Sequence, residues 1–365
     1  MILDNIINDI NKKRKYKIIT KGISEKEYSK IPFTSEKLNY MTYGGIPRGC
    51  LTEFAGIESS GKTTTALDIV KQAQILFKKE YEMKLEKADT EEKKKIIEAE
   101  GPMTVVYADC ENTLDEGWAK LLGVDISNMY ILSPEQDTAE TIFDILIELL
   151  ESGRVGLMVI DSLGVMVSSQ AFEKSIEQKT YGGIAMALTA FSKKAIMLCQ
   201  RYDTTIIGIN QIREDIGNPY GGIITTGGRG WKHNCTLRLM FNKGSYIDEN
   251  NAEISKSRAV SPFGNIVEVA IEKTKSCKPD RRRAQYILNY DTGINYILDL
   301  IDLGIAAEII TQKGAYYYFY EEDGSTSTHN GQDLIFQGKN NLYNFLQNNP
   351  DFTAMLRENI GRLYQ

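Results

Sequence analysis

Short apolar runs alternate with helical stretches through the middle of the chain. The runs predict buried strands at residues 51–54, 103–109, 129–132, 157–161 and 204–210. Apolar positions with helical spacing lie between them, at residues 62–78, 117–122, 138–150 and 183–200. Strands and helices that alternate in this way are typical of a parallel sheet covered on both faces. We therefore predict an α/β fold with a mostly parallel central sheet.

The two ends of the chain have different patterns. Near the start, isoleucines at helical spacing are followed by the basic residues 12–15, which predicts a short amphipathic helix that must dock on this chain or a neighbour. After residue 228, apolar runs at 236–241, 266–272 and 286–290 predict strands that finish the sheet antiparallel. From residue 291 a smaller α+β unit begins. The predicted parts are an N-terminal helix and linker (1–34), a core (35–290) and a C-terminal domain (291–365).

Composition places the chain among globular proteins. It has 365 residues, of which 42% are hydrophobic and 25% charged. Its longest apolar runs are too short to cross a bilayer, and its first residues lack a signal peptide's apolar run and cleavage site. We therefore expect a cytoplasmic protein without membrane contact. Five scattered cysteines and two histidines favour neither a disulfide framework nor a zinc site.

Charge is unevenly distributed along the chain. The formal net charge of -6 is carried by residues 291–365, which hold ten acidic and four basic residues. The neutral remainder contains a basic cluster at 273–283, which either binds a polyanion or is a solvated face. In residues 78–100, fifteen of 23 residues are charged, which predicts a solvated helix or helical hairpin that projects from the body.

A phosphate-binding motif follows the first predicted strand. Residues 56–63 read GIESSGKT and match GxxxxGK[ST] in full, with a strand before and a helix after. Glycines let backbone N–H groups fold around a β-phosphate, and the helix N-terminus favours negative charge. Lys62 would reach the β- and γ-phosphates, and the Thr63 hydroxyl would bind Mg²⁺. This context makes a chance match a minor alternative.

Polar residues end three of the other predicted strands. Asp161 would hold Mg²⁺ through water, or it caps the strand. Glu111 and Asp109 are both candidates for the base that activates water. The amides of Asn210 and Gln211 would either bind the γ-phosphate and respond to its loss, or cap a loop.

These segments together resemble the RecA family of homologous recombinases. The resemblance runs from about Pro32 to the end of the chain. The matching segments are, in order, GIESSGKTT, DCENTLDEGWAKLLGVD, VIDS, INQIR, TTGG, EKTKSCKP, YDTGINYILDLIDLG and QGKNNLYNFLQNNP.

The resemblance implies an ATP and Mg²⁺ site with named roles. Lys62 and Thr63 bind phosphate and Mg²⁺, Asp161 supports the metal, Glu111 activates water, and Gln211 contacts the γ-phosphate. An aromatic stacks on adenine at the position of Trp118, and Asp115 contacts the base. The nucleotide-binding residues are then Gly56, Glu58, Ser59, Ser60, Gly61, Lys62, Thr63, Thr64, Asp115 and Trp118.

The resemblance also implies a shared ATP site and two DNA loops. Lys273 and Lys275 match lysines that a neighbouring subunit inserts toward ATP. This role competes with the interpretation that the basic cluster binds a polyanion. Residues 281–283 of the cluster remain unassigned. The loops correspond to about 169–182 and 214–232, whose alternative is an ordinary surface loop. The implied DNA-binding residues are Arg213, Gly227, Gly228, Arg229, Trp231 and Lys232.

The expected function is therefore that of a DNA-dependent ATPase. It would form a homo-oligomeric helical filament on single-stranded DNA, hold double-stranded DNA beside it, and exchange strands between homologous sequences. A hexameric helicase or translocase of the same fold, and an ATP-switched assembly protein without DNA binding, remain alternatives. His233 stands where the family has phenylalanine, and Met186 where it has arginine, which indicates a divergent member.

Overall fold

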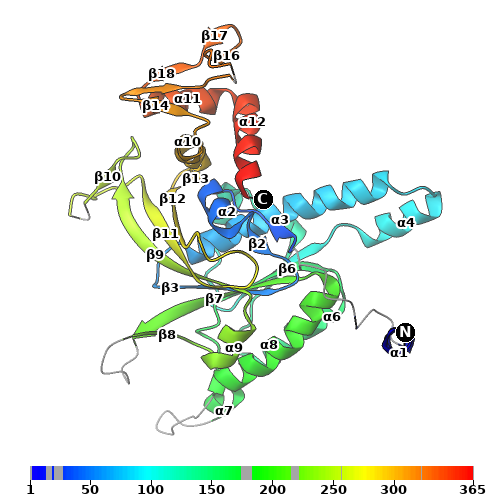
Figure 1. Ribbon diagram of the computed structural model, residues 1–365. Coiled ribbons are helices and arrows are strands. Elements are labelled where there is room, and N and C mark those ends of the chain that lie inside the picture. Colours follow the sequence, from blue (N-terminus) through cyan, green and yellow to red (C-terminus); the bar gives the residue numbers. More distant parts are fainter. Residues whose placement is uncertain are drawn as a thin grey trace.

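A sheet with helices on both faces forms the centre of the molecule (Figure 1). The structure is a computed structural model that describes residues 2–13, 19, 28–173, 183–214, 222–255, 257–321 and 323–364. A smaller unit at the C-terminal end stands at one end of the body, and a helical hairpin projects from its side (Figure 1).

The predicted sheet is confirmed, with its parallel centre and antiparallel end. Within the described residues it has eleven strands, nine of them in the order β13-β12-β11-β9-β3-β7-β6-β4-β5, while β8 pairs with β7 and β10 with β9. Strands β9, β3, β7, β6, β4 and β5 are parallel, and β11, β12 and β13 run antiparallel beyond β9. The strands are β3 (Leu51–Gly56), β4 (Thr104–Asp109), β5 (Met129–Leu132), β6 (Val155–Asp161), β7 (Thr205–Glu214), β8 (Ile223–Thr225), β9 (Leu237–Ile247), β10 (Glu253–Ile254), β11 (Gly264–Thr274), β12 (Arg283–Asn289) and β13 (Gly293–Ile294).

Helices cover both faces because successive residues of a strand point to opposite sides. On β4, Val105 and Tyr107 join one core cluster with α2, α3 and α5, whereas Val106 and Ala108 join a second cluster with α6, α8 and α9. The helices of the body are α2 (Glu36–Thr42), α3 (Lys62–Glu86), α4 (Glu91–Glu100), α5 (Glu116–Leu122), α6 (Ala139–Glu151), α7 (Ser169–Phe172), α8 (Gly183–Tyr202) and α9 (Gly228–Asn234), with a short 3₁₀ turn at Ile126–Asn128.

The charged segment forms the predicted helical hairpin. Helix α3 continues to Glu86, beyond the end expected near residue 78, and α4 returns alongside it. No residue of α4 is buried. The hairpin therefore adds surface to the body and no core.

A third core lies in the C-terminal unit. Its cluster joins α10 with α11, α12 and the aromatic strand β15. The elements are α10 (Tyr296–Ala306), β14 (Thr311–Lys313), β15 (Tyr316–Tyr318), β16 (Thr328–His329), β17 (Gln332–Asp333), β18 (Ile335–Gln337), α11 (Lys339–Asn348), α12 (Pro350–Gly361) and a 3₁₀ turn at Arg362–Tyr364.

The N-terminal region begins with the predicted amphipathic helix, α1 (Ile2–Lys13). The side chains of Leu3, Ile6 and Ile10 on its apolar side are exposed. Inside the expected linker, β1 (Lys30–Ile31) pairs with β2 (Ile46–Pro47). Among the described residues, no helix combines the length and apolarity needed to cross a membrane.

Candidate nucleotide and DNA site

The phosphate-binding motif forms the loop between β3 and α3. Gly61 has φ +91°, in the left-handed region that favours glycine, and it caps α3. The Lys62 ammonium lies inside the loop, where it donates to the Ile57 carbonyl at 2.5 Å and to Ser60 Oγ at 3.4 Å. Burial lowers the pKa of Lys62, and the carboxylates of Asp161 and Glu111 oppose that shift. The lysine is therefore held at the loop, where a phosphate would replace its carbonyl partner.

Two oxygen-bearing side chains that could bind a metal, Thr63 and Asp161, meet beside this loop. Thr63 Oγ1 donates to Asp161 Oδ2 at 2.9 Å, and the buried Tyr107 hydroxyl donates to the same oxygen at 2.7 Å. Burial raises the pKa of Asp161, while these two hydrogen bonds oppose the shift. Hydroxyl and carboxylate oxygens are the ligands that Mg²⁺ prefers. The donor set therefore fits a divalent metal bound next to a phosphate.

Glu111 and Gln211 meet across the sheet edge. Ser162 Oγ and Gln211 Nε2 both donate to Glu111 Oε1, the latter at 3.4 Å. Asp109 is engaged differently, because its carboxylate accepts the backbone N–H groups of Thr113 at 3.1 Å and Leu114 at 2.9 Å. Of the two candidate bases, Glu111 is therefore the one that contacts Gln211, and Asp109 holds the loop after β4.

The side-chain amides of Asn210 and Gln211, on β7, have different partners. Asn210 is fully buried, and its Nδ2 donates to Glu53 Oε1 at 3.0 Å and to the Thr226 carbonyl at 2.8 Å. Its amide nitrogen is therefore occupied inside the protein, as loop capping predicts. Gln211 alone faces Glu111.

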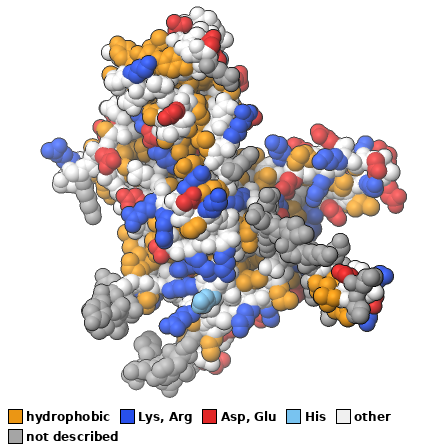
Figure 2. Space-filling model, viewed as in Figure 1, with side chains coloured by type: hydrophobic (Ala, Val, Ile, Leu, Met, Phe, Trp, Pro, Cys, Tyr) orange, Lys and Arg blue, Asp and Glu red, His pale blue; other side chains and the backbone are white. Residues whose placement is uncertain are grey.

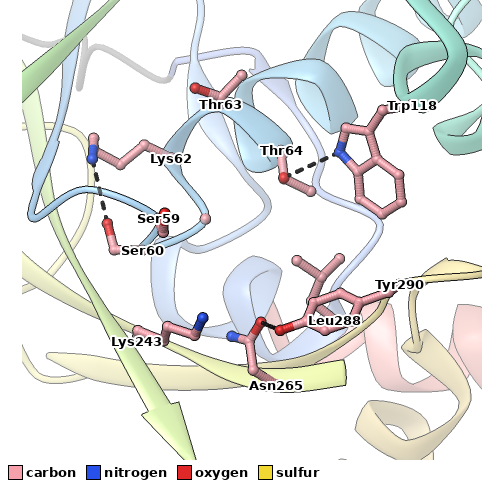
Figure 3. A pocket seen from close by; sticks show the side chains of 11 residues that line it. Ser59, Ser60, Lys62, Thr63, Thr64, Trp118, Lys243, Asn265, Leu288 and Tyr290 are labelled. Carbon is pink, nitrogen blue, oxygen red and sulfur yellow. Dashed lines mark hydrogen bonds between the residues drawn. The ribbon is translucent and has the colours of Figure 1, made fainter. Parts of the chain in front are cut away.

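A pocket of about 270 Å³ adjoins the loop (Figure 3). Trp118 lines it, and its Nε1 donates to Thr64 Oγ1 at 3.3 Å. In Figure 3, Trp118 and Tyr290 lie on one side of the pocket and Lys62 on the other. Asp115 caps α5 through the Trp118 N–H at 3.0 Å and does not line the pocket. The lining residues are Ser59, Ser60, Gly61, Lys62, Thr63, Thr64, Trp118, Lys243, Asn265, Leu288 and Tyr290.

Sequence reasoning missed four of these lining residues. Lys243, Asn265, Leu288 and Tyr290 come from β9, β11 and the end of β12. The Tyr290 hydroxyl donates to Asn265 Oδ1 at 2.9 Å. No motif marks them, because only the antiparallel register, which sets Asn265 opposite Leu288, brings them to the nucleotide loop.

Lys273 and Lys275 lie at the C-terminal end of α9. Lys273 Nζ donates to the Lys232 carbonyl at 2.6 Å and the His233 carbonyl at 2.8 Å, and Lys275 Nζ lies 3.5 Å from the latter. Cations are favourable at a helix C-terminus. Burial and the charge of Lys275 lower the pKa of Lys273. Within this chain, the lysines therefore touch the segment implied for DNA rather than the chain's own nucleotide pocket.

The predicted DNA-binding residues divide into exposed and buried ones. Gly228 and Arg229 are exposed on α9, Arg213 is exposed at the end of β7, and Lys232 is half-buried. Residues 174–182 and 215–221 of the two predicted loops lie outside the described residues. Of the two departures from the family pattern, His233 is exposed after Lys232 and Met186 is 57% exposed on α8.

Two of those residues do not fit a direct DNA contact in this arrangement. Trp231 is fully buried, and its indole fills the space left by the missing side chain of Gly208, where a Cβ would lie 2.5 Å from Cζ2. Gly227 is also buried, and a Cβ there would lie 2.3 Å from Leu188 Cδ2. Both positions serve the close packing of α9 on the body, so the implied DNA contact of Trp231 finds no exposed surface in this arrangement.

The basic cluster is only partly available to a partner. The Arg281 guanidinium lies between the rings of Tyr40 and Tyr43, at 3.8 and 4.1 Å, and donates to the Leu363 carbonyl. The Arg281 side chain is therefore engaged in contacts within the protein, whereas Arg282 and Arg283 are exposed. Figure 2 shows Lys and Arg side chains gathered on the visible face over the region where Figure 1 places α9.

Comparison with known families shows the family of this chain. The model of the RecA N-terminal domain matches residues 1–88 and 92–295, and that of the RecA C-terminal domain matches residues 298–365. The chain belongs to the RecA family. The gap between the two ranges matched by the N-terminal model, residues 89–91, lies at the tip of the α3–α4 hairpin.

Curated RecA proteins from diverse bacteria are similar over most of their length. The chain is 30% identical over 318 residues to the protein RecA of Fusobacterium nucleatum, covering 87% of this chain and 71% of the relative. It is 32% identical to that of Acidothermus cellulolyticus, with 87% and 78% covered, and 30% identical over 342 residues to that of Aquifex aeolicus, with 93% and 85% covered.

Membership of the RecA family carries the fold and the general activity. The chain is an ATP-dependent recombinase that acts in DNA recombination and repair, and a DNA-dependent ATPase. Nucleotide binding with a divalent metal follows from the same membership. Neither the helicase nor the DNA-free alternative is favoured by these relatives.

Proposed function

We propose that this protein forms a helical filament of identical subunits on single-stranded DNA, pairs it with homologous double-stranded DNA, and controls the filament through ATP and Mg²⁺. The arrangement of Thr63, Asp161, Glu111 and Gln211 at one edge of the sheet supports this proposal most directly. A cytoplasmic location, where DNA and ATP are both present, belongs to the same proposal.

Each residue of the site has one task in this proposal. Lys62 turns from the Ile57 carbonyl to the phosphates, and the amides of the loop surround them. Thr63 and Asp161 hold Mg²⁺, which neutralises phosphate charge when it is bound. Glu111 orients the attacking water and accepts its proton. Gln211 donates to the γ-phosphate and responds to its loss. Its amide lies beside Glu111, so it is close to where the phosphate is cleaved.

Adenine occupies the pocket beside the loop. Trp118 and Tyr290 supply aromatic surface there, and aromatic rings stack on any base. Asp115 contributes by capping the helix that carries Trp118. A nucleotide therefore spans from the aromatic wall to the phosphate loop.

Helix α1 and the lysine pair contact neighbouring subunits in the filament. Helix α1 covers its exposed apolar side chains on a neighbouring subunit. Lys273 and Lys275 leave the α9 carbonyls and reach the neighbour's ATP, where opposite charge attracts them. Exposed Arg213, Gly228 and Arg229, with Lys232, contact the DNA backbone without reading its sequence.

Electron microscopy with single-stranded DNA and a slowly hydrolysed ATP analogue tests the proposal. We expect extended helical filaments whose formation needs both ligands, and ATP turnover that rises with added DNA. Closed six-fold rings without filaments would support a helicase or translocase instead. Turnover that ignores single-stranded DNA would support an assembly protein that does not bind DNA.

A further inference from the structure

A fully buried carboxylate lies behind the nucleotide loop. Glu53 on β3 has no exposed surface, and it accepts hydrogen bonds from Asn210 Nδ2 at 3.0 Å and from Arg238 Nε. The parallel register sets Glu53 opposite Gly208 of β7 and opposite Arg238 of β9. A buried ion pair is weak evidence for stability, because apolar residues of similar size often replace one without loss. The contact of Glu53 with Asn210 therefore points to a role of the pair beyond stability.

The pair holds the amide of Asn210. That amide nitrogen has two hydrogens, one for Glu53 and one for the Thr226 carbonyl at 2.8 Å. Thr226 directly precedes Gly227, which has φ +92° and caps α9. Asn210 therefore ties the strand that leads into the nucleotide loop to the backbone that enters α9.

Strand β7, which carries Asn210, also carries the residue proposed to contact the γ-phosphate. Gln211 follows Asn210 directly, and its amide donates to Glu111. Successive side chains of a strand point to opposite faces, so one short stretch of backbone faces the nucleotide with Gln211 and the entry to α9 with Asn210. A shift of this stretch on nucleotide binding would move both contacts together, provided that the Asn210 amide keeps its hydrogen bonds to Glu53 and Thr226.

The far end of α9 has its own anchor. Lys273 holds the carbonyls of Lys232 and His233, and Trp231 fixes the middle of the helix in the core. The short helix is therefore held at three places. The Asn210 amide, bonded to Glu53 and to the Thr226 carbonyl, links the entry of this helix to the strand that precedes the chain's own nucleotide loop.

We propose that Glu53, paired with Arg238, is a positioning residue that fixes the Asn210 amide and so couples the nucleotide site to the DNA segment that begins at Thr226. Glu53 touches neither nucleotide nor DNA. The inference rests on the proposed function, since it concerns how DNA binding and ATP hydrolysis are linked in this chain.

The test replaces the ion pair with apolar residues. In the Glu53→Met/Arg238→Met variant the fold is kept, because both charges leave together, but the Asn210 amide loses one acceptor. We expect nucleotide binding and turnover without DNA as in the wild type, while stimulation by oligo(dT) falls roughly tenfold, within the range of coupling free energies between sites. Thermal unfolding is measured on the same samples.

A second variant and a control keep the test decisive. Asn210→Ala leaves the ion pair in place and removes the link to Thr226, so it should lose stimulation in the same way. Glu36→Met/Arg357→Met removes another ion pair with a buried carboxylate, between α2 and α12, and should keep full stimulation.

The outcomes separate this inference from the proposed function. Full stimulation in a folded Glu53→Met/Arg238→Met or Asn210→Ala variant would overturn the inference. An equal loss of basal and stimulated turnover, parallel to a lower melting temperature, would show that Glu53 only stabilises the core. A wild type without DNA stimulation would overturn the proposed function and this inference with it, before any variant is compared.

Discussion

Gln211 Nε2 lies 3.4 Å from Glu111 Oε1, although the two residues are a hundred positions apart in the sequence. In the proposed mechanism, the group that responds to the γ-phosphate therefore contacts the group that activates water. A movement of Gln211 would then change the hydrogen bonding of the proposed base. Ser162 donates to the same carboxylate oxygen and keeps Glu111 at the sheet edge when Gln211 moves.

Replacing the base should separate binding from hydrolysis. The Glu111→Gln variant should bind ATP but turn it over at least ~10²-fold more slowly, the low end for losing a general base. Steady-state turnover and nucleotide binding, followed by Trp118 emission, measure the two effects. In the matched Asp109→Asn control we expect a lower melting temperature with turnover largely kept, because its carboxylate holds Thr113 and Leu114. Near-normal turnover in Glu111→Gln would show that the base is another group.

Mixed filaments should show whether the lysine pair acts on a neighbour. Subunits with Lys273→Ala/Lys275→Ala and subunits with Glu111→Gln should each be inactive alone. Once mixed, sites that combine Glu111 of one parent with the lysines of the other are intact, so turnover should partly return. The measurement is ATP turnover against mixing ratio, with co-assembly checked by pull-down of a tagged parent. A co-assembled mixture as inactive as its parents would place the lysines in cis.

The two tryptophans should report different environments. In Trp118→Phe the emission comes from buried Trp231, so we expect a short-wavelength spectrum that iodide quenches weakly. In Trp231→Phe it comes from half-buried Trp118, which should be accessible to iodide and change when ATP enters the pocket. Fluorescence with and without nucleotide tests both. Strong iodide quenching of Trp118→Phe would contradict the burial of Trp231 and favour the DNA contact implied for that residue.

A buried carboxyl in α10 should make stability depend on pH. Burial raises the pKa of Asp299 to about 7, although Lys37 lies 3.7 Å away and Ser35 donates to it. The folded state therefore binds more protons than the unfolded state between about pH 4 and 7, so the free energy of unfolding falls as pH rises through that window. The loss is at most about 4 kcal/mol, since a tenfold change in proton affinity is worth about 1.4 kcal/mol.

Chemical unfolding between pH 5 and 8 measures that effect. In Asp299→Asn the loss should disappear, so the variant gains on the wild type as pH rises. Asp302→Asn is the control, because its lysine partners hold the pKa of Asp302 below its usual value and its contribution lies at lower pH. A wild type and an Asp299→Asn variant with parallel pH profiles would contradict the assignment.

The sequence by itself determined the nucleotide loop, the place of Asp161 beside it and the order of the main elements. Lys62, Thr63 and Asp161 were predictable because the motif is local and because parallel strands bring their C-terminal ends to one edge of a sheet. The charged hairpin was predictable because a segment with so few apolar residues cannot form a core.

Tertiary structure alone decided between residues that look alike in the sequence. Asp109 and Glu111 are two positions apart, and Asn210 and Gln211 are neighbours, but backbone direction sends one of each pair into the protein and the other to the site. The family resemblance implied a DNA contact for Trp231, whereas Gly208, on a distant strand, leaves the space in which the indole is buried. Such pairings depend on register between strands far apart in the chain, and no local pattern encodes that register.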